Sequence, residues 1–72
     1  MAQKTPRLHI SVFTSYASHQ RVYQVMLDGS PLCNETDGMN AAMVYAAAVA
    51  NQPSLGNGST PMWDGDAGVW HD

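Results

Sequence analysis

The sequence predicts a small α+β domain, and three features of the chain support this fold class. Apolar and polar residues alternate over residues 7–14 and 21–27, as in strands with one buried face. The dipeptide Asp28-Gly29 follows the second segment and favours a two-residue hairpin turn. An alanine-rich segment over residues 37–50 has the composition of a helix. Together they predict a three-stranded antiparallel meander with one Ala-rich helix across one face, followed by a short C-terminal strand or hairpin.

Each predicted strand has its own position in the meander. The first strand is half-buried, and its alternation gives two opposite sets of side chains: Leu8, Ile10 and Val12 on one face, and His9, Ser11 and Phe13 on the other. Residues 15–20 are polar and form a wide loop. Residues 21–27 carry apolar side chains on both faces, which predicts a central strand. A short third strand over residues 30–34 follows the turn, and Pro31 indicates that it lies at the sheet edge.

The helix is predicted to begin after Asp37, whose carboxylate can accept hydrogen bonds from the first turn. Asn51 and Pro53 are expected to end it. On this interpretation Ala46→Asp would unfold the domain, because an unpaired carboxylate is costly to bury. The stripe expected to face the sheet recurs at helical spacing and consists of Met39, Ala42, Met43, Ala46, Val49 and Ala50.

The remaining segments are predicted to be less regular. Residues 1–6 form a loose N-terminus, and residues 51–60, rich in Gly and small polar residues, form a flexible loop. One small domain accounts for residues 1–72. Residues 61–72 favour either a hairpin or one short strand with an irregular tail, because a turn-forming segment separates two short apolar runs, Met62-Trp63 and Val69-Trp70.

The composition is that of a folded domain. Apolar residues make up 44% of the chain and charged residues 12%, which is unlike the composition of disordered proteins. The single Cys33 excludes an internal disulfide. No apolar run is long enough for a signal peptide or a membrane-spanning helix. We therefore expect a cytoplasmic protein that does not associate with a membrane.

The charges are unevenly placed along the chain. All three basic residues precede residue 22 and all six acidic residues follow it, and the net charge is −3. Such a chain repels phosphate backbones, so direct nucleic-acid binding is not expected. A protein partner with a basic surface is expected instead, because an acidic face accelerates encounter with it. The alternative is that the carboxylates only keep the domain soluble.

No pattern in the sequence predicts a metal site or a catalytic site. Asp64, Gly65 and Asp66 resemble the opening of a calcium loop, but the further oxygen ligands and the bidentate Glu that such a loop needs do not follow. A tight turn is expected there. The histidines and Cys33 lack the spacing of zinc ligands, and nothing near Cys33 in the sequence would orient a nucleophile. We expect no metal, no cofactor and no enzymatic activity.

Partner binding is expected to involve acidic and aromatic residues late in the chain. Trp63 and Trp70 either close the open end of the core or form a binding surface, because Trp is enriched in interface hot spots. Carboxylates in the turn between them are expected to be solvated and to contribute little to stability. If these carboxylates proved irrelevant, the interface would lie on the sheet side around His9, Ser11 and Phe13. The candidate partner-binding residues are Asp64, Asp66, Trp63, Trp70, Asp72, Asp28 and Glu35.

An Ala-rich helix after a β-hairpin with an Asp-Gly turn, in an acidic chain of this size, resembles small phage-encoded inhibitors of the anti-CRISPR type. The resemblance covers residues 7–50 and the acidic balance. It implies a non-enzymatic inhibitor that covers a basic site on a host defence complex of the CRISPR-Cas type. The alternative is a small structural or regulatory module that forms a homodimer through the open edge of its sheet. Added salt should slow the first kind of association and not the second.

Overall fold

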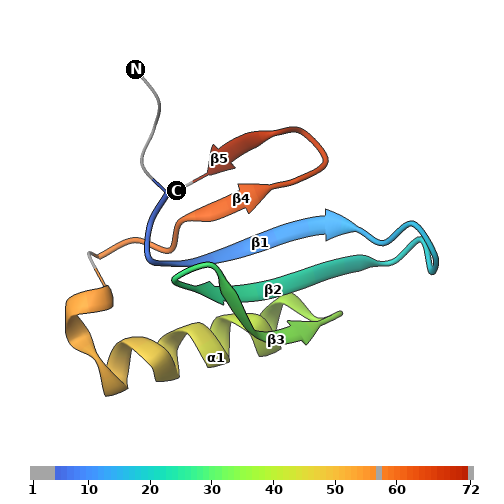
Figure 1. Ribbon diagram of the computed structural model, residues 1–72. Helices are drawn as coiled ribbons and strands as arrows, with labels where there is room; N and C mark the ends of the chain where they lie inside the picture. The colour runs from blue at the N-terminus through green and yellow to red at the C-terminus, as the bar shows by residue number, and fades with distance from the viewer. Residues whose placement is uncertain (1–4, 57, 72) are drawn as a thin grey trace.

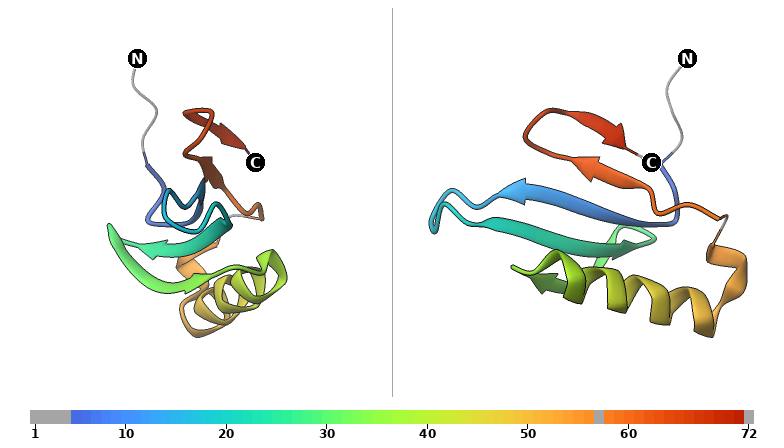
Figure 2. Two further views of the ribbon diagram at one scale, coloured as in Figure 1. Left: turned by 90° about the vertical axis from the view of Figure 1, so that its right-hand side faces the viewer. Right: turned by 180° about the vertical axis from the view of Figure 1, so that it is seen from behind.

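The computed structural model describes residues 5–56 and 58–71, and it confirms the α+β fold. In chain order the elements are β1 (Leu8–Thr14), β2 (Arg21–Leu27), β3 (Ser30–Glu35), α1 (Gly38–Asn51), the 3-10 helix η1 (Pro53–Leu55), β4 (Met62–Asp64) and β5 (Val69–His71). The strands form one sheet in the order β3-β2-β1-β4-β5, with α1 across one face (Figures 1 and 2). The meander β1-β2-β3 is antiparallel, whereas β4 pairs parallel to β1, so the sheet is mixed.

The meander forms as its alternation and its turn predict. β1 and β2 pair along their whole length, from Leu8 opposite Leu27 to Thr14 opposite Arg21. Asp28 and Gly29 have φ angles of 51° and 85°, the positive values that a type I′ turn requires at both central positions. β2 lies between two other strands and β3 lies at the edge, in agreement with the sequence-based assignment.

The core lies between β1, β2 and α1. Its buried members come from alternate positions of the strands and from one face of the helix: Leu8, Ile10, Val12, Val25, Ala41 and Tyr45. The predicted inward face of β1 is therefore confirmed. A core this small buries limited apolar area, so each of its side chains contributes a large share of the stability.

The helix begins as expected but faces the sheet with a different stripe. The Asp37 carboxylate accepts a hydrogen bond from the backbone N–H of Met39 at 2.9 Å, which confirms the N-cap. Ala41 is 0% exposed and Tyr45 is also buried, whereas Met39 and Met43 are 73% and 65% exposed. Of the stripe predicted to be buried, Met39, Ala42, Met43, Ala46 and Ala50 are exposed and only Val49 is partly buried.

Tyr45 explains why the helix is rotated away from the predicted orientation. Its ring is the largest side chain on α1, and it turns inward together with Val44 and Ala48, which pack against the core. Its hydroxyl donates to the carbonyl oxygen of Ser59 at 3.2 Å, so the polar end of the ring is also satisfied. None of the helices in the described part of the chain has the length and apolar character needed to cross a membrane.

The segment after α1 is more ordered than predicted. η1 interrupts what the sequence indicates as a flexible loop over residues 51–60, because Pro53 is pre-set for the first turn of a helix. The chain then returns beside β1, where the carbonyl oxygen of the buried Pro61 accepts from the N–H of Ile10 at 3.0 Å. This contact starts the parallel pairing of β4 with β1, in which Ile10 lies opposite Met62.

The two apolar runs at the end of the chain form a hairpin, which was one of the two arrangements expected. β4 and β5 are antiparallel, and Trp63 lies directly opposite Trp70. Because α1 contacts β1, β2 and β3, the hairpin extends the sheet beyond the area that the helix covers (Figure 1).

The revised helix orientation predicts opposite outcomes for two aspartate substitutions. Ala41→Asp should lower the free energy of unfolding by more than about 3 kcal/mol, because it buries an unpaired carboxylate against β1 and β2. Ala46→Asp is the matched control on the exposed face and should cost about 1 kcal/mol or less. Thermal melts followed by circular dichroism measure both. Equal losses of stability would show that the helix is not oriented in this way.

Candidate functional site

The face of the sheet opposite α1 is not covered by any described helix. Since side chains alternate along a strand, the inward direction of Ile10 and Val12 turns His9, Ser11 and Phe13 to this second face. The pairing register places side chains of the neighbouring strands on the same face. Gln24 lies opposite Ser11 on one side, Trp63 lies opposite Ser11 on the other, and Trp70 lies opposite Trp63: the helix-free face therefore includes His9, Ser11, Phe13, Gln24, Trp63 and Trp70.

Three aromatic rings contact one another on the helix-free face. The Trp63 and Trp70 ring centroids are 5.2 Å apart with the planes tilted by 58°. His9 meets Trp70 edge-on at a centroid distance of 5.1 Å. His9 is only 8% exposed, and its Nδ1 lies 3.1 Å from the carbonyl oxygen of Pro6. A carbonyl oxygen only accepts, so this contact requires a proton on Nδ1 and fixes the orientation of the imidazole.

These rings border a hollow on the protein surface. It is lined by Thr5, His9, Trp63 and Trp70 and has a volume of about 280 Å³. Both tryptophans are half-buried, and neither belongs to the core cluster on the other side of the sheet. The hollow therefore offers indole surface, and its lining residues include no Asp, Glu, Lys or Arg. We call this group of four residues the tryptophan site.

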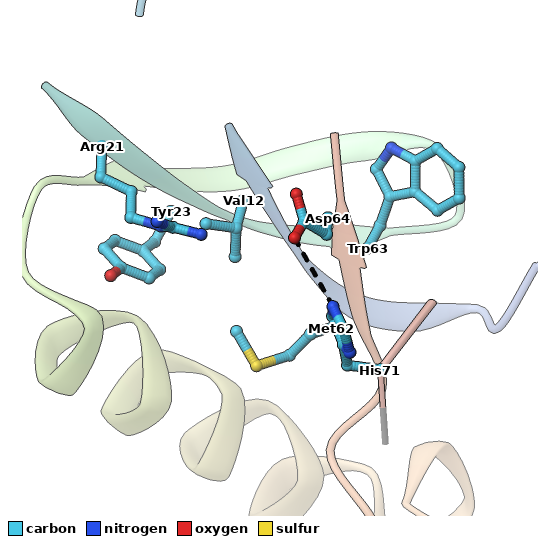
Figure 3. A pocket seen from close by; sticks show the side chains of 7 residues that line it. All are labelled: Val12, Arg21, Tyr23, Met62, Trp63, Asp64 and His71. Carbon is cyan, nitrogen blue, oxygen red and sulfur yellow. Dashed lines mark ion pairs between the residues drawn. The ribbon is translucent and has the colours of Figure 1, made fainter. Parts of the chain in front are cut away.

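A second hollow lies on the helix side of the sheet, and Figure 3 shows the side chains that line it. Its volume is about 230 Å³, and its lining includes Arg21, Tyr23, Asp64 and His71. Asp64 Oδ2 lies 3.5 Å from His71 Nε2, and Figure 3 shows the indole of Trp63 projecting away from these side chains. The lining contains a carboxylate and an imidazole but no Ser, Thr or Cys that this pair could activate as a nucleophile.

The carboxylates of the β4-β5 turn accept hydrogen bonds from within the protein, which the sequence did not predict. Asp64 Oδ1 accepts from the backbone N–H groups of Asp66 and Ala67 at 3.1 and 3.0 Å. Asp66 accepts from the N–H and the hydroxyl of Thr14 at 3.1 and 2.7 Å, which connects the turn to the end of β1. The turn itself is the tight turn that the sequence predicts. Asp64 therefore closes the turn, and Asp66 connects the hairpin to the end of β1.

The other predicted acidic residues lie elsewhere. Asp28 forms a bidentate ion pair with Arg7, in which Nε donates to Oδ1 at 2.8 Å and Nη2 donates to Oδ2 at 3.0 Å. The hydrogen bond from Arg7 lowers the pKa of Asp28. This pair sits near Leu8, whereas Asp64 lies opposite Val12, towards the other end of β1. Glu35 ends the edge strand β3, and Asp72 lies outside the described residues. The structure thus brings Trp63 and Trp70 together but does not gather the carboxylates into one patch.

The sequence does not predict Thr5 as part of the tryptophan site. It places His9 on the alternative sheet surface with Ser11 and Phe13, and not beside the tryptophans. Both residues join the site because β4 pairs with β1, and no local pattern predicts a parallel pairing between distant segments. Within residues 5–56 and 58–71, no three His, Cys, Asp or Glu side chains come together in a group that could hold a metal ion.

Acidification is expected to loosen the β4-β5 hairpin. The hydrogen bond from Ala67 N–H, aided by His71 and Asp66, lowers the pKa of Asp64 below its ordinary value of 3.8. A lowered folded-state pKa gives stability that is complete above the ordinary value and is lost as the pH falls through the folded-state value. Tryptophan emission should therefore shift to the red on titration from about pH 7 to about pH 2.

Two variants test this assignment. Asp64→Asn should remove the part of the emission change that Asp64 causes, while Asp28→Asn, which removes a lowered pKa at the other end of the sheet, should retain it. If Asp64→Asn titrates like the parent protein, the carboxylate does not hold the hairpin.

No family model, curated protein or solved structure matches the chain. The two faces of the sheet and the outer surface of α1 are therefore the features from which a function can be inferred.

Proposed function

We propose that the protein is a non-enzymatic binding module that recognises a protein partner through the tryptophan site. The observation that carries this proposal is the pair of half-buried indoles, Trp63 and Trp70, in contact at 5.2 Å beside a hollow on the helix-free face. Trp contributes a large contact area with few rotatable bonds, which is why it dominates interface hot spots. The contact with His9 and the opposed positions on β4 and β5 hold the two rings in place before a partner arrives.

The preferred contact of this site is a basic side chain. Indole faces are the best aromatic partners for Lys and Arg cations, and no cationic group among the lining residues competes for them. The net charge of −3 adds a long-range attraction to a basic surface, which raises the association rate more than the final affinity. Inhibition would follow if the module covered a basic site on a larger complex, and a host defence complex of the CRISPR-Cas type is the target that the resemblance implies.

The acidic residues have a secondary part in this proposal. Asp64 and Asp66 position the hairpin that carries the indoles, and they also contribute to the negative field of the protein. Self-association through a sheet edge receives less support. β3 contains Pro31 and a register irregularity, and β5 is only three residues long, features that natural proteins use to block edge pairing.

The proposal predicts that Trp70→Leu weakens partner binding without unfolding the domain. An anchor side chain contributes about 2 kcal/mol or more, so Kd should rise at least about 30-fold. The probe is an Arg-rich octapeptide, with a Glu-rich octapeptide of the same length for comparison. Both tryptophans of the chain are in the site, so quenching of intrinsic emission measures occupancy directly. The Arg-rich peptide should quench the emission, and less so as salt increases.

Val69→Ala provides the matched control. Val69 precedes Trp70 on β5, and it lies opposite Asp64, on the other side of the strand from the indoles. The Val69→Ala variant should bind the Arg-rich peptide with the affinity of the parent protein. Loss of the folded state in Trp70→Leu, detected by circular dichroism, would assign the indoles a structural role instead. Equal quenching by both peptides would contradict recognition of a basic partner.

A further inference from the structure

The outer surface of α1 is apolar and carries no charge. None of the 14 residues of the helix is charged, and its solvent side exposes Met39, Ala42, Met43, Ala46 and Ala50, flanked by Asn40, Ala47 and Asn51. Met39 and Met43 are 73% and 65% exposed, more than any other large apolar side chain in the described residues except Tyr16. A surface helix normally places charged and polar residues on its outer face, so an apolar outer face indicates a contact that covers it.

The spacing of this outer stripe is that of a helix-helix contact. Met39, Met43, Ala46 and Ala50 follow one another at intervals of four, three and four residues, the pattern of a coiled-coil seam. The seam is about 16 Å long at the rise of an α-helix. It points away from the buried face defined by Ala41 and Tyr45, so it does not contribute to the core of its own chain.

The two halves of the seam are complementary in volume. Its first half carries the large Met39 and Met43, and its second half carries the small Ala46 and Ala50. In an antiparallel pair related by a two-fold axis, Met39 of one copy faces Ala50 of the other, and Met43 faces Ala46. Each layer then contains one large and one small side chain, which packs without voids. A parallel pair would place Met on Met and Ala on Ala.

Charge does not prevent a second copy from docking on this seam. Two chains of net charge −3 repel one another, but along the helix no charged group needs to lose its water. Antiparallel helices in addition align their dipoles in opposite directions.

We propose that the occupant of this surface is a second copy of the chain, bound through an antiparallel pairing of two α1 helices. The inference goes beyond the proposed function, because the seam and the tryptophan site lie on opposite faces of the sheet and can be tested separately. One pair of helices buries less than the roughly 800 Å² per partner of a standard interface. The dimer is therefore a reversible one whose population rises with concentration.

Sedimentation velocity between about 10 and about 500 µM tests this proposal. The parent chain should shift from one chain mass towards two, and added salt should leave the association intact or strengthen it, because it screens the repulsion between acidic copies. Met43→Lys and Ala46→Asp should each weaken dimerisation at least about tenfold, since each puts an unpaired charge into the seam. Asn51→Lys adds the same charge as Met43→Lys at the exposed helix position that lies farthest from the seam around the helix axis, and it should dimerise like the parent.

A mixture of the two seam variants tests the antiparallel register. Lys at position 43 of one copy would face Asp at position 46 of the other, so mixing Met43→Lys with Ala46→Asp should restore a heterodimer to within about threefold of the parent affinity. Circular dichroism confirms that each variant is folded. A parent chain that stays monomeric over this range would overturn the proposal, as would variants that fail to complement one another. The proposal would also be overturned if the chain stayed monomeric and its seam variants failed to bind a different protein that the parent chain binds.

Discussion

The double pairing of β1 is the constraint on which the rest of the structure depends. This strand is antiparallel to β2 on one side and parallel to β4 on the other. Its successive side chains point to opposite faces of the sheet. Leu8, Ile10 and Val12 form the centre of the core under α1, while His9 supports Trp70 on the opposite face. A single seven-residue strand thus supplies both the main source of stability and the base of the proposed binding site.

The turn carboxylates connect these two functions. Asp66 holds Thr14 at the end of β1, and Asp64 closes the turn that aligns Trp63 with Trp70. The backbone adds to this attachment, because the N–H of Gly65 donates to the carbonyl oxygen of Val12 at 2.7 Å. A hairpin of two three-residue strands would be marginal alone. Its attachment to β1 at both the strand and the turn gives the indole pair a defined geometry, which reduces the entropy lost on binding.

Local patterns in the sequence were sufficient for the meander, the Asp28-Gly29 turn and the Asp37 cap, because each is decided by residues that are neighbours in the chain. The orientation of α1 was not predictable in this way. Both sides of the helix are apolar, so only the packing of Tyr45 against the sheet selects one of them. For the candidate site, the pairing of Trp63 with Trp70 followed from the hairpin pattern. The burial of His9 beneath Trp70 did not, because it requires β4 to lie beside β1.

The parallel pairing of β1 with β4 also has a consequence for the order of folding. The meander and α1 form from segments that are close in the chain, whereas the bond between Thr14 and Asp66 spans 52 positions. Contacts of long sequence separation pay a large loop-closure entropy and form late. β4 and β5 should therefore dock last, on a preformed meander, and detach first in local unfolding. The tryptophan pair then belongs to the unit of the molecule that unfolds most easily, and the binding site exists only while that unit remains docked.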